Sequence, residues 1–164
     1  DALSNLPSNP LKLQSTFIGS ICSADLRVLK IVSDNIILAN GVQLGGHVEI
    51  QKYAIVGGLT PVHQFCKIGE HSLVGGGLRV VQDIPPFIIA NGQPLKFSGI
   101  NALGLRRRKF SVTQRTNIKK AYKILYNSNM NTSQALEKIK KDFSSQNEIS
   151  TIISFINDSS RGLI

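Results

Sequence analysis

Residues 32–85 read VSDNIILANGVQLGGHVEIQKYAIVGGLTPVHQFCKIGEHSLVGGGLRVVQDIP. An aliphatic residue recurs at every sixth position of this stretch, the next residue is often Gly or Ala, and the fifth tends to be compact. The aliphatic series consists of Val32, Leu38, Leu44, Ile50, Val56, Val62, Ile68, Val74 and Val80. Neither the 3.6-residue period of a helix nor the alternation of a half-buried strand produces this spacing.

A period of six indicates a β-solenoid whose triangular rungs have one short strand per side. The aliphatic residue points inward, and the small residue after it permits a tight corner. A single rung cannot bury its apolar face, so stacking of rungs supplies the burial. We expect residues 32–85 to form about three rungs of about 18 residues each.

The segment DIPPF at 83–87 is expected to end the array, because two prolines remove backbone donors and cannot continue a central strand. An irregular segment rich in Gly, Asn and Pro follows at 86–103. Three helical patterns come next, from the N-cap Ser111 to about Asn127, from Thr132 or Ser133 onward, and over about 148–157. They predict a small bundle that packs on the solenoid or on a neighbouring chain.

The chain therefore divides into three expected parts. Residues 1–30 lack a clean hexad lattice, 31–103 form the β-helix with its terminal loop, and 104–164 form a helical domain. No run of about 18 apolar residues occurs, so we expect no transmembrane segment and a cytoplasmic location. The sequence begins at Asp1 without a methionine, which favours a fragment or a processed chain.

Cysteine content and charge narrow the functional classes. Cys22 and Cys66 form no Cys-x-x-Cys pair and have no histidine at ligand spacing, which argues against a disulfide scaffold and a structural zinc site. The net charge of +9 is concentrated in residues 104–164, which hold 12 Lys/Arg against 4 Asp/Glu. Such an asymmetry suggests an acidic partner, whether a nucleic acid, a membrane surface or an acidic protein.

The histidines differ in their hexad positions. His63 stands where other rungs prefer Gly or Ala, and position alone leaves a functional role and a satisfied structural histidine equally open. His47 follows Gly45 and Gly46 and carries a weaker signal. His71 follows Glu70 at a corner, where we expect an exposed side chain.

Nine short strings resemble one protein family in their order and spacing. They are ILAN at 37–40, GHV at 46–48, IVGG at 55–58, VHQFCKIG at 62–69, VGG at 74–76, QDIPPF at 82–87, GIN at 99–101, GLRRR at 104–108 and SRGLI at 160–164. Over roughly residues 32–164 the chain resembles the C-terminal part of the bacterial UDP-N-acetylglucosamine acyltransferases that start lipid A synthesis. General hexapeptide proteins share the period but lack the VHQFC string and the GLxRR segment.

The resemblance implies a left-handed parallel β-helix of hexapeptide repeats, followed by a small C-terminal α-helical domain. It also implies a homotrimer with active sites between adjacent solenoids. The implied reaction transfers a 3-hydroxyacyl chain from acyl carrier protein to the 3-hydroxyl of UDP-N-acetylglucosamine. The carrier thioester is the acyl donor, and neither a further cofactor nor a metal is expected.

The site residues implied by the resemblance fall into five groups. They are Gly46 at the oxyanion; His47, His63 and Gln64 at the sugar nucleotide; Asn101, Arg107 and Arg108 facing the nucleotide; Gly76 at the end of the acyl chain; and Arg115, Lys119, Lys120 and Lys123 at the carrier protein. The backbone amide of Gly46 suits its role, because glycine permits close approach and a fixed N–H stabilises negative charge. Guanidinium groups suit phosphate oxygens, and a basic helix surface suits an acidic carrier protein.

The chain departs from the family at the catalytic position. Family members carry His-x-Ala-His-Asp-Cys just before these hexads, and the second histidine is the general base. Counting back from Leu38 places Asp25, Val28 and Leu29 at the first histidine, the base and its orienting aspartate. Because valine cannot accept a proton and general-base catalysis contributes about 10²–10⁴-fold, we expect an impaired enzyme. Leu103 is a second departure, at a position where many relatives have Glu.

The whole stretch of residues 1–30 fails to match the family. A shifted reading frame, a pseudogene or a diverged non-catalytic relative would each produce such a mismatch. We favour a truncated or impaired copy of the acyltransferase. The alternative is a non-catalytic trimeric subunit that binds the sugar nucleotide or the carrier protein. Nucleic-acid binding is the weakest hypothesis, because the aromatic interleaving and docking motifs of such proteins are missing.

Overall fold

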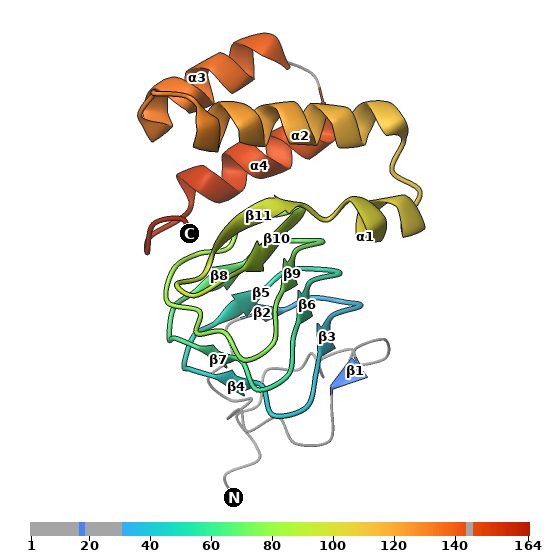
Figure 1. The fold of residues 1–164 in the computed structure, drawn as a ribbon, viewed down its shortest axis with the longest axis vertical. Helices are drawn as coiled ribbons and strands as arrows, with labels where there is room; N and C mark the ends of the chain where they lie inside the picture. Colours follow the sequence, from blue (N-terminus) through green and yellow to red (C-terminus); the bar gives the residue numbers. More distant parts are fainter. Residues whose placement is uncertain (1–16, 19–30, 144–145) are drawn as a thin grey trace, which may run out of the picture.

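The computed structural model describes residues 17–18, 31–143 and 146–164. A coil of short strands forms one end of the molecule, and the helices α2 (Val112–Asn127), α3 (Thr132–Asp142) and α4 (Asn147–Asn157) form the other (Figure 1). The hairpin of β10 (Ile88–Asn91) and β11 (Lys96–Ile100) lies between the coil and these helices (Figure 1).

The coil consists of two-residue strands. They are β1 (Phe17–Ile18), β2 (Ile31–Val32), β3 (Ile37–Leu38), β4 (Gln43–Leu44), β5 (Glu49–Ile50), β6 (Ile55–Val56), β7 (Pro61–Val62), β8 (Lys67–Ile68) and β9 (Leu73–Val74). Within the series β2–β9 each strand pairs in parallel with the third strand after it, so that Ile37 lies opposite Ile55 and Ile55 opposite Leu73. The second residue of each strand from β3 to β9 is aliphatic and 0–9% exposed. The predicted hexapeptide β-helix is confirmed.

The rungs have three faces, which we name the β6 face (β1, β3, β6, β9), the β7 face (β4, β7) and the β8 face (β2, β5, β8). Between the faces the chain turns at residues with positive φ, such as His47 (59°), Tyr53 (62°) and Leu59 (57°). We call the three edges the histidine edge (45–47 and 63–65), the aromatic edge (51–53, 69–71 and 85–87) and the glycine edge (57–59 and 75–77). Small residues are required where edges stack, since a Cβ on Gly45 would lie 2.5 Å from the Gln64 nitrogen.

The prediction that the array ends at 83–87 and becomes irregular is wrong. Ile84 forms a parallel bridge with Ile68, and β10 pairs in parallel with β9 before β11 returns antiparallel to it. The two prolines lie at the aromatic edge between Ile84 and Ile88. The equivalent N–H groups of Gln51 and Gly69 donate to the following rung, whereas Pro85 lies in the last described rung at this edge. Gly69 accommodates Pro86, because a Cβ on Gly69 would lie 2.4 Å from the Pro86 nitrogen.

All three predicted helices are confirmed. Ser111 and Asn131 start α2 and α3 with capping boxes completed by Gln114 and Gln134. The buried face of α2 includes Tyr122, whose hydroxyl donates to the Pro86 carbonyl. One further helix was not predicted, α1 (Ala102–Arg107), which begins at the N-cap Asn101.

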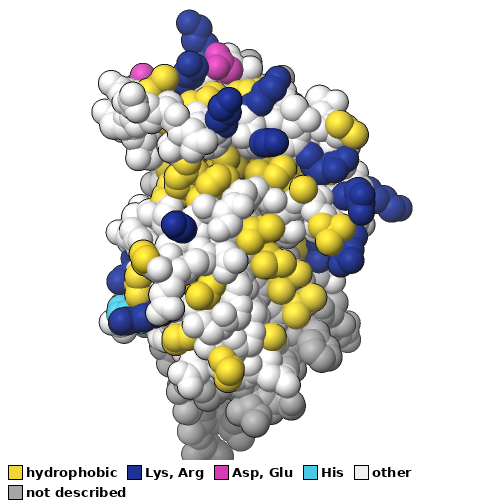
Figure 2. Space-filling view, in the orientation of Figure 1, with side chains coloured by type: hydrophobic (Ala, Val, Ile, Leu, Met, Phe, Trp, Pro, Cys, Tyr) yellow, Lys and Arg dark blue, Asp and Glu magenta, His cyan; other side chains and the backbone are white. Residues whose placement is uncertain are grey.

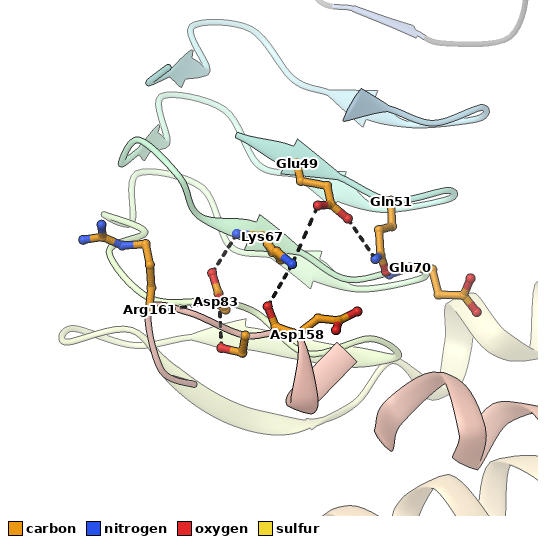
Figure 3. Close-up of polar contacts among 8 residues, drawn as sticks. Glu49, Gln51, Lys67, Glu70, Asp83, Asp158 and Arg161 are labelled. Atoms are coloured by element: carbon orange, nitrogen blue, oxygen red, sulfur yellow. Dashed lines mark hydrogen bonds and ion pairs between the residues drawn. The ribbon is translucent and has the colours of Figure 1, made fainter. Parts of the chain in front are cut away.

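The C-terminal tail returns to the solenoid and is held there by the buried carboxylate of Asp83 (Figure 3). One oxygen accepts from the Lys67 backbone N–H at 2.8 Å. The other accepts from the Ser159 hydroxyl at 2.7 Å and the Arg161 backbone N–H at 3.4 Å. The Asp83 backbone makes two further hydrogen bonds with the tail. Its N–H donates to the Gly162 carbonyl, and its carbonyl accepts from the Ile164 N–H. The Asp83 carboxylate therefore accepts from both the solenoid and the tail and joins the two.

We expect Asp83→Ala to lower the free energy of unfolding by about 3 kcal/mol, because each buried donor left without an acceptor costs about 1–3 kcal/mol. Urea denaturation at one fixed protein concentration measures this loss. Asp142→Ala, an exposed aspartate on α3, is the matched control and should cost less than about 0.5 kcal/mol. Equal losses in the two variants would contradict this role of Asp83.

Candidate functional site

The histidine edge gathers four residues of the implied site. His47 stacks on Phe65 of the next rung, with ring centroids 5.0 Å apart and an angle of 7° between the planes. His63 is partly exposed, and its Nδ1 lies 3.1 Å from the Gln64 carbonyl oxygen. Because a carbonyl only accepts, Nδ1–H is the donor in this contact, and Nε2 is left for another partner. Gln64 itself is exposed beside it.

Gly46 lies on the same edge, one rung from Gln64. Its carbonyl accepts from the Phe65 N–H at 2.9 Å, whereas its own N–H enters no backbone hydrogen bond among the residues that the structure describes. A backbone donor at a corner, on a residue that has no side chain of its own, suits the stabilisation of an oxyanion.

The three residues expected to face the nucleotide lie at the aromatic edge and on α1. The Arg108 guanidinium carbon lies 3.9 Å from the centre of the Tyr53 ring. Arg107 is exposed in the last turn of α1. Asn101 is 6% exposed. One chain therefore does not bring these residues to His47, His63 and Gln64, which lie across the β8 face from them.

Asn101 has a structural role that sequence reasoning missed. Its side-chain amide donates to the His71 carbonyl at 2.9 Å, and its side-chain oxygen accepts from the Gly104 N–H at 3.1 Å. These bonds cap α1 and fix it to the aromatic edge. The sequence feature that could have indicated this cap is the asparagine three residues before Gly104. The contact of Asn101 with the nucleotide stays a prediction.

His71 is not exposed as we expected; its side chain is 6% exposed. Its ring stacks on Tyr53 at 4.8 Å and on Phe87 at 5.7 Å, and Phe110 meets it edge-on at 5.1 Å. The segment after α1 thus covers a corner that the hexad pattern alone leaves open. Burial, assisted by the positive charges of Arg108 and Lys52, lowers the pKa of His71 from 6.5 to about 4.

Gly76 lies on the glycine edge, where a Cβ would come within 3.1 Å of the Gly58 carbonyl oxygen. A cleft of about 330 Å³ opens beside this edge. It is lined in part by Pro61, Gly77, Leu78, Pro94, Leu95 and Ile164. The cleft is mainly apolar, as a site for an acyl chain would be, and the role of Gly76 stays a prediction.

Arg161 is a cation near the histidine edge to which the sequence analysis assigned no role. Its Nε donates to the Val81 carbonyl at 3.2 Å, in the rung after His63. Figure 3 shows the guanidinium directed away from the tail. The only sequence signal was its place in the closing SRGLI string.

The expected carrier contacts lie on α2. Lys119, Lys120 and Lys123 are exposed, and Arg115 is partly buried. A groove of about 540 Å³ between α2 and the end of α3 is lined in part by Lys120, Lys123, Ile124 and Phe143. The groove combines apolar side chains with two lysines and one aspartate, Asp142.

Several expectations fall elsewhere. Asp25, Val28 and Leu29 lie outside the described residues, and Leu103 is 50% exposed on α1. Within the described ranges no group of three or more His, Cys, Asp or Glu side chains is placed to hold a metal ion. Among the helices in those ranges, none combines the length and apolar character needed to cross a membrane.

Fold and site together define a hexapeptide-repeat β-helix protein with a C-terminal helical domain. The family model described as UDP-N-acetylglucosamine O-acyltransferase, domain 2, matches residues 83–164. The chain belongs to this UDP-N-acetylglucosamine O-acyltransferase family.

Similar proteins agree with this assignment. The chain is 44% identical over 134 residues to the acyl-[acyl-carrier-protein]–UDP-N-acetylglucosamine O-acyltransferase of Aliivibrio salmonicida, covering 82% of this chain and 51% of that protein. The UDP-N-acetylglucosamine acyltransferase structure from Campylobacter jejuni superposes with a TM-score of 0.81 at 32% identity, over 90% of this chain and 57% of that one. LpxA from Acinetobacter baumannii gives 0.79 at 35%, over 91% and 55%. The chain spans about half the length of the relatives it matches.

The burial of His71 predicts a pH dependence of stability. Unfolded His71 takes up a proton near pH 6.5, whereas folded His71 does so only near pH 4. Stability from this group is therefore fully present above pH 6.5 and is lost as the pH falls to about 4, by about 2–3 kcal/mol. His71→Phe removes this loss. As the pH falls to about 4, the free energy of unfolding of the variant should therefore decrease less than that of the wild type.

Denaturation curves at several pH values between 7 and 4 measure the difference. Other acid-titrating groups act equally in both proteins and cancel. Phenylalanine suits the backbone, since Phe65 and Phe87 occupy equivalent corners with φ of 64° and 68°. Parallel curves for the variant and the wild type would show that His71 is not held neutral by burial.

Proposed function

We propose that this chain supplies the C-terminal half of an O-acyltransferase site of lipid A biosynthesis. The reaction transfers a 3-hydroxyacyl chain from acyl carrier protein to the 3-hydroxyl of UDP-N-acetylglucosamine. The observation that carries the proposal is the histidine edge, where the N–H of Gly46 and the polar groups of His47, His63 and Gln64 meet in a chain of this family. With this activity the expected location is the cytoplasm.

Each residue has a physical role in the proposal. The Gly46 amide stabilises the negative charge that develops on the thioester oxygen. His47, His63 and Gln64 orient the sugar nucleotide, and Arg107 and Arg108 bind its phosphates. The cleft beside Gly76 receives the acyl chain. The position of the general base is that of Val28, so turnover by this chain is expected to be low.

The site requires more than one copy of the chain. His63 and Arg108 lie on different edges of one solenoid, so a ligand that contacts both must lie between two copies. The outward side of the β6 face supports such contact, because it carries Ile37, Ile55, Leu73 and Ile89, of which Ile37 is 37% exposed. Figure 2 shows hydrophobic side chains running down the solenoid. We propose that the copies close around a threefold axis as a homotrimer, as the resemblance implies.

We also propose a division of the chain into two parts with different roles. We divide the chain into a β-helix with its terminal hairpin over 31–103 and a helical domain over 104–164. Of residues 1–30, the structure describes only 17–18, which form β1 and pair with β3. The helical part contributes the carrier surface and the solenoid contributes the reacting groups.

A second candidate function follows from Val28. A chain without the general base would retain the binding groups of the two edges, and would act as a trimeric subunit that binds the sugar nucleotide or the carrier protein. Turnover separates the two candidates. Acylated sugar nucleotide formed from UDP-N-acetylglucosamine and a 3-hydroxyacyl carrier protein supports the enzyme, and binding without product supports the subunit.

We expect the chain to associate as a trimer and to bind UDP-N-acetylglucosamine. Light scattering at micromolar concentration measures the mass, and calorimetric titration measures binding. His63→Ala together with Gln64→Ala should weaken binding about 30–150-fold, since each lost polar contact costs about 1–1.5 kcal/mol. A stable monomer, or no heat of binding at millimolar ligand, would refute the proposed site.

The carrier protein is assigned to the groove between α2 and α3. Lys120 and Lys123 flank the apolar floor formed by Ile124 and Phe143. Acyl carrier proteins are acidic, so this surface should steer the thioester and add apolar contact. Lys and Arg side chains gather over the helical end of the molecule (Figure 2).

Reversal of two charges tests this surface. Lys120→Glu with Lys123→Glu should weaken binding of the carrier protein about tenfold at low salt and reduce its salt dependence. Binding of the sugar nucleotide should stay within about twofold. Lys138→Glu with Lys141→Glu on α3 changes the charge equally, and these lysines are exposed away from the groove lining. Equal effects of the two pairs would make the basic surface non-specific.

A further inference from the structure

An aromatic column runs along the aromatic edge. Tyr53, His71 and Phe87 occupy equivalent corners of successive rungs, with φ of 62°, 57° and 68°. Their rings stack in sequence at 4.8 Å and 5.7 Å, with interplanar angles of 25° and 24°. Phe110 closes the side of the column, edge-on to His71 at 5.1 Å and to Phe87 at 5.8 Å. The column is rigid because backbone ladder and ring stacking fix the same residues.

Arg108 lies at the Tyr53 end of this column. Its guanidinium carbon is 3.9 Å from the Tyr53 ring centre, which is cation–π distance. The ion pairs between described residues join Lys52 to Glu70 and Lys67 to Glu49, and neither involves Arg108. Among the residues that the structure describes, Arg108 is therefore held by a ring and not by a carboxylate.

Stacking on the Tyr53 ring leaves the N–H donors of the Arg108 guanidinium available for a phosphate. A guanidinium that rests face-on against a ring keeps its N–H donors, because they radiate in its own plane. A carboxylate in the same place would occupy two donors and neutralise the charge. Arg108 thus retains both the charge and the fork that a phosphate requires.

The backbone of Arg108 is fixed by the same edge. Arg108 is the C-cap of α1, and its N–H donates to the Gly104 carbonyl at 3.1 Å. The other end of α1 is tied to the column, because Asn101 donates to the His71 carbonyl through its side chain and to the Phe87 carbonyl through its backbone. Both the main chain and the side chain of Arg108 therefore take their positions from the column.

We propose that Tyr53 is a positioning residue for Arg108, holding the guanidinium as a charged fork for the diphosphate of a sugar nucleotide. The proposal rests on the phosphate role given to Arg108 under the proposed function. Tyr53 contacts Arg108 and not the ligand. Its hydroxyl is dispensable and its ring is not.

Three substitutions test this role in the chain as it stands. Tyr53→Phe keeps the ring, Tyr53→Leu removes it, and Arg108→Ala removes the group that is positioned. Leucine suits the backbone at this corner, since Leu59 has a φ of 57° at an equivalent corner. Tyr126→Leu is the matched control, because it removes a stack on Phe97 at 4.5 Å in the helical part of the chain.

Calorimetric titration with UDP-N-acetylglucosamine gives the first readout. Tyr53→Leu should weaken binding about five- to tenfold, as loss of a cation–π contact predicts. Tyr53→Phe and Tyr126→Leu should stay within about twofold. In the Arg108→Ala background, Tyr53→Leu should have no further effect, because its partner is gone. An equal loss in both backgrounds would overturn the positioning role.

NMR gives a second readout that needs no ligand. The Nε–H proton of Arg108 should be shifted by the ring current of Tyr53, and the shift should persist in Tyr53→Phe and vanish in Tyr53→Leu. An unshifted Arg108 signal would overturn the inference. If Arg108→Ala binds the nucleotide as tightly as the wild type, the phosphate role of Arg108 under the proposed function fails, while the NMR result still decides whether Tyr53 holds the guanidinium.

Discussion

The parallel ladder between rungs is the interaction on which the rest of the structure depends. Gly57 donates to the Val74 carbonyl at 2.9 Å, and Gly75 donates to the Ala90 carbonyl at 3.0 Å. Because each rung is held in register with the next, residues at equivalent hexad positions stack in columns. Inside the coil the columns are aliphatic and form the core. At the edges they place His47 on Phe65 and the aromatic rings on one another, so the functional side chains inherit their positions from the backbone.

The sequence predicted those parts of the fold that follow from local periodicity. Each side of a rung takes about six residues and turns one aliphatic side chain inward, so the period of six follows from the rung itself. The helical patterns after Ser111 carry their own capping signals. The end of the solenoid was misjudged because a rule about ladder donors in central strands was applied to Pro85 and Pro86, which lie in the last described rung at the aromatic edge. His71 was misjudged for a different reason, since its burial comes from Phe110, a residue beyond the array. Contacts of that kind between distant segments leave no period in the sequence.

The candidate site could be predicted only as a set of residues and not as an arrangement. The resemblance named His63 and Arg108 together, but nothing local to either residue indicates that they lie on different edges. That separation is a consequence of the three-sided rung and of where α1 docks. Asn101 shows the same limit, because its contacts with His71 and Gly104 arise from the docking of α1. The role of Tyr53 became visible only through the position of Arg108 above its ring.

The geometry of an edge is the reason why the proposed function requires the proposed assembly. A prism edge is convex and only a few residues wide, whereas sites for small molecules are concave and bury most of the ligand. Gly46, His47 and His63 therefore cannot enclose a sugar nucleotide by themselves, however well each is oriented. In the proposed assembly, a concave site arises where the histidine edge of one copy meets the aromatic edge of the next, with Arg108 supplied across the contact. The solenoid would then provide fixed columns of polar and charged groups, and association would convert two exposed edges into one enclosed site.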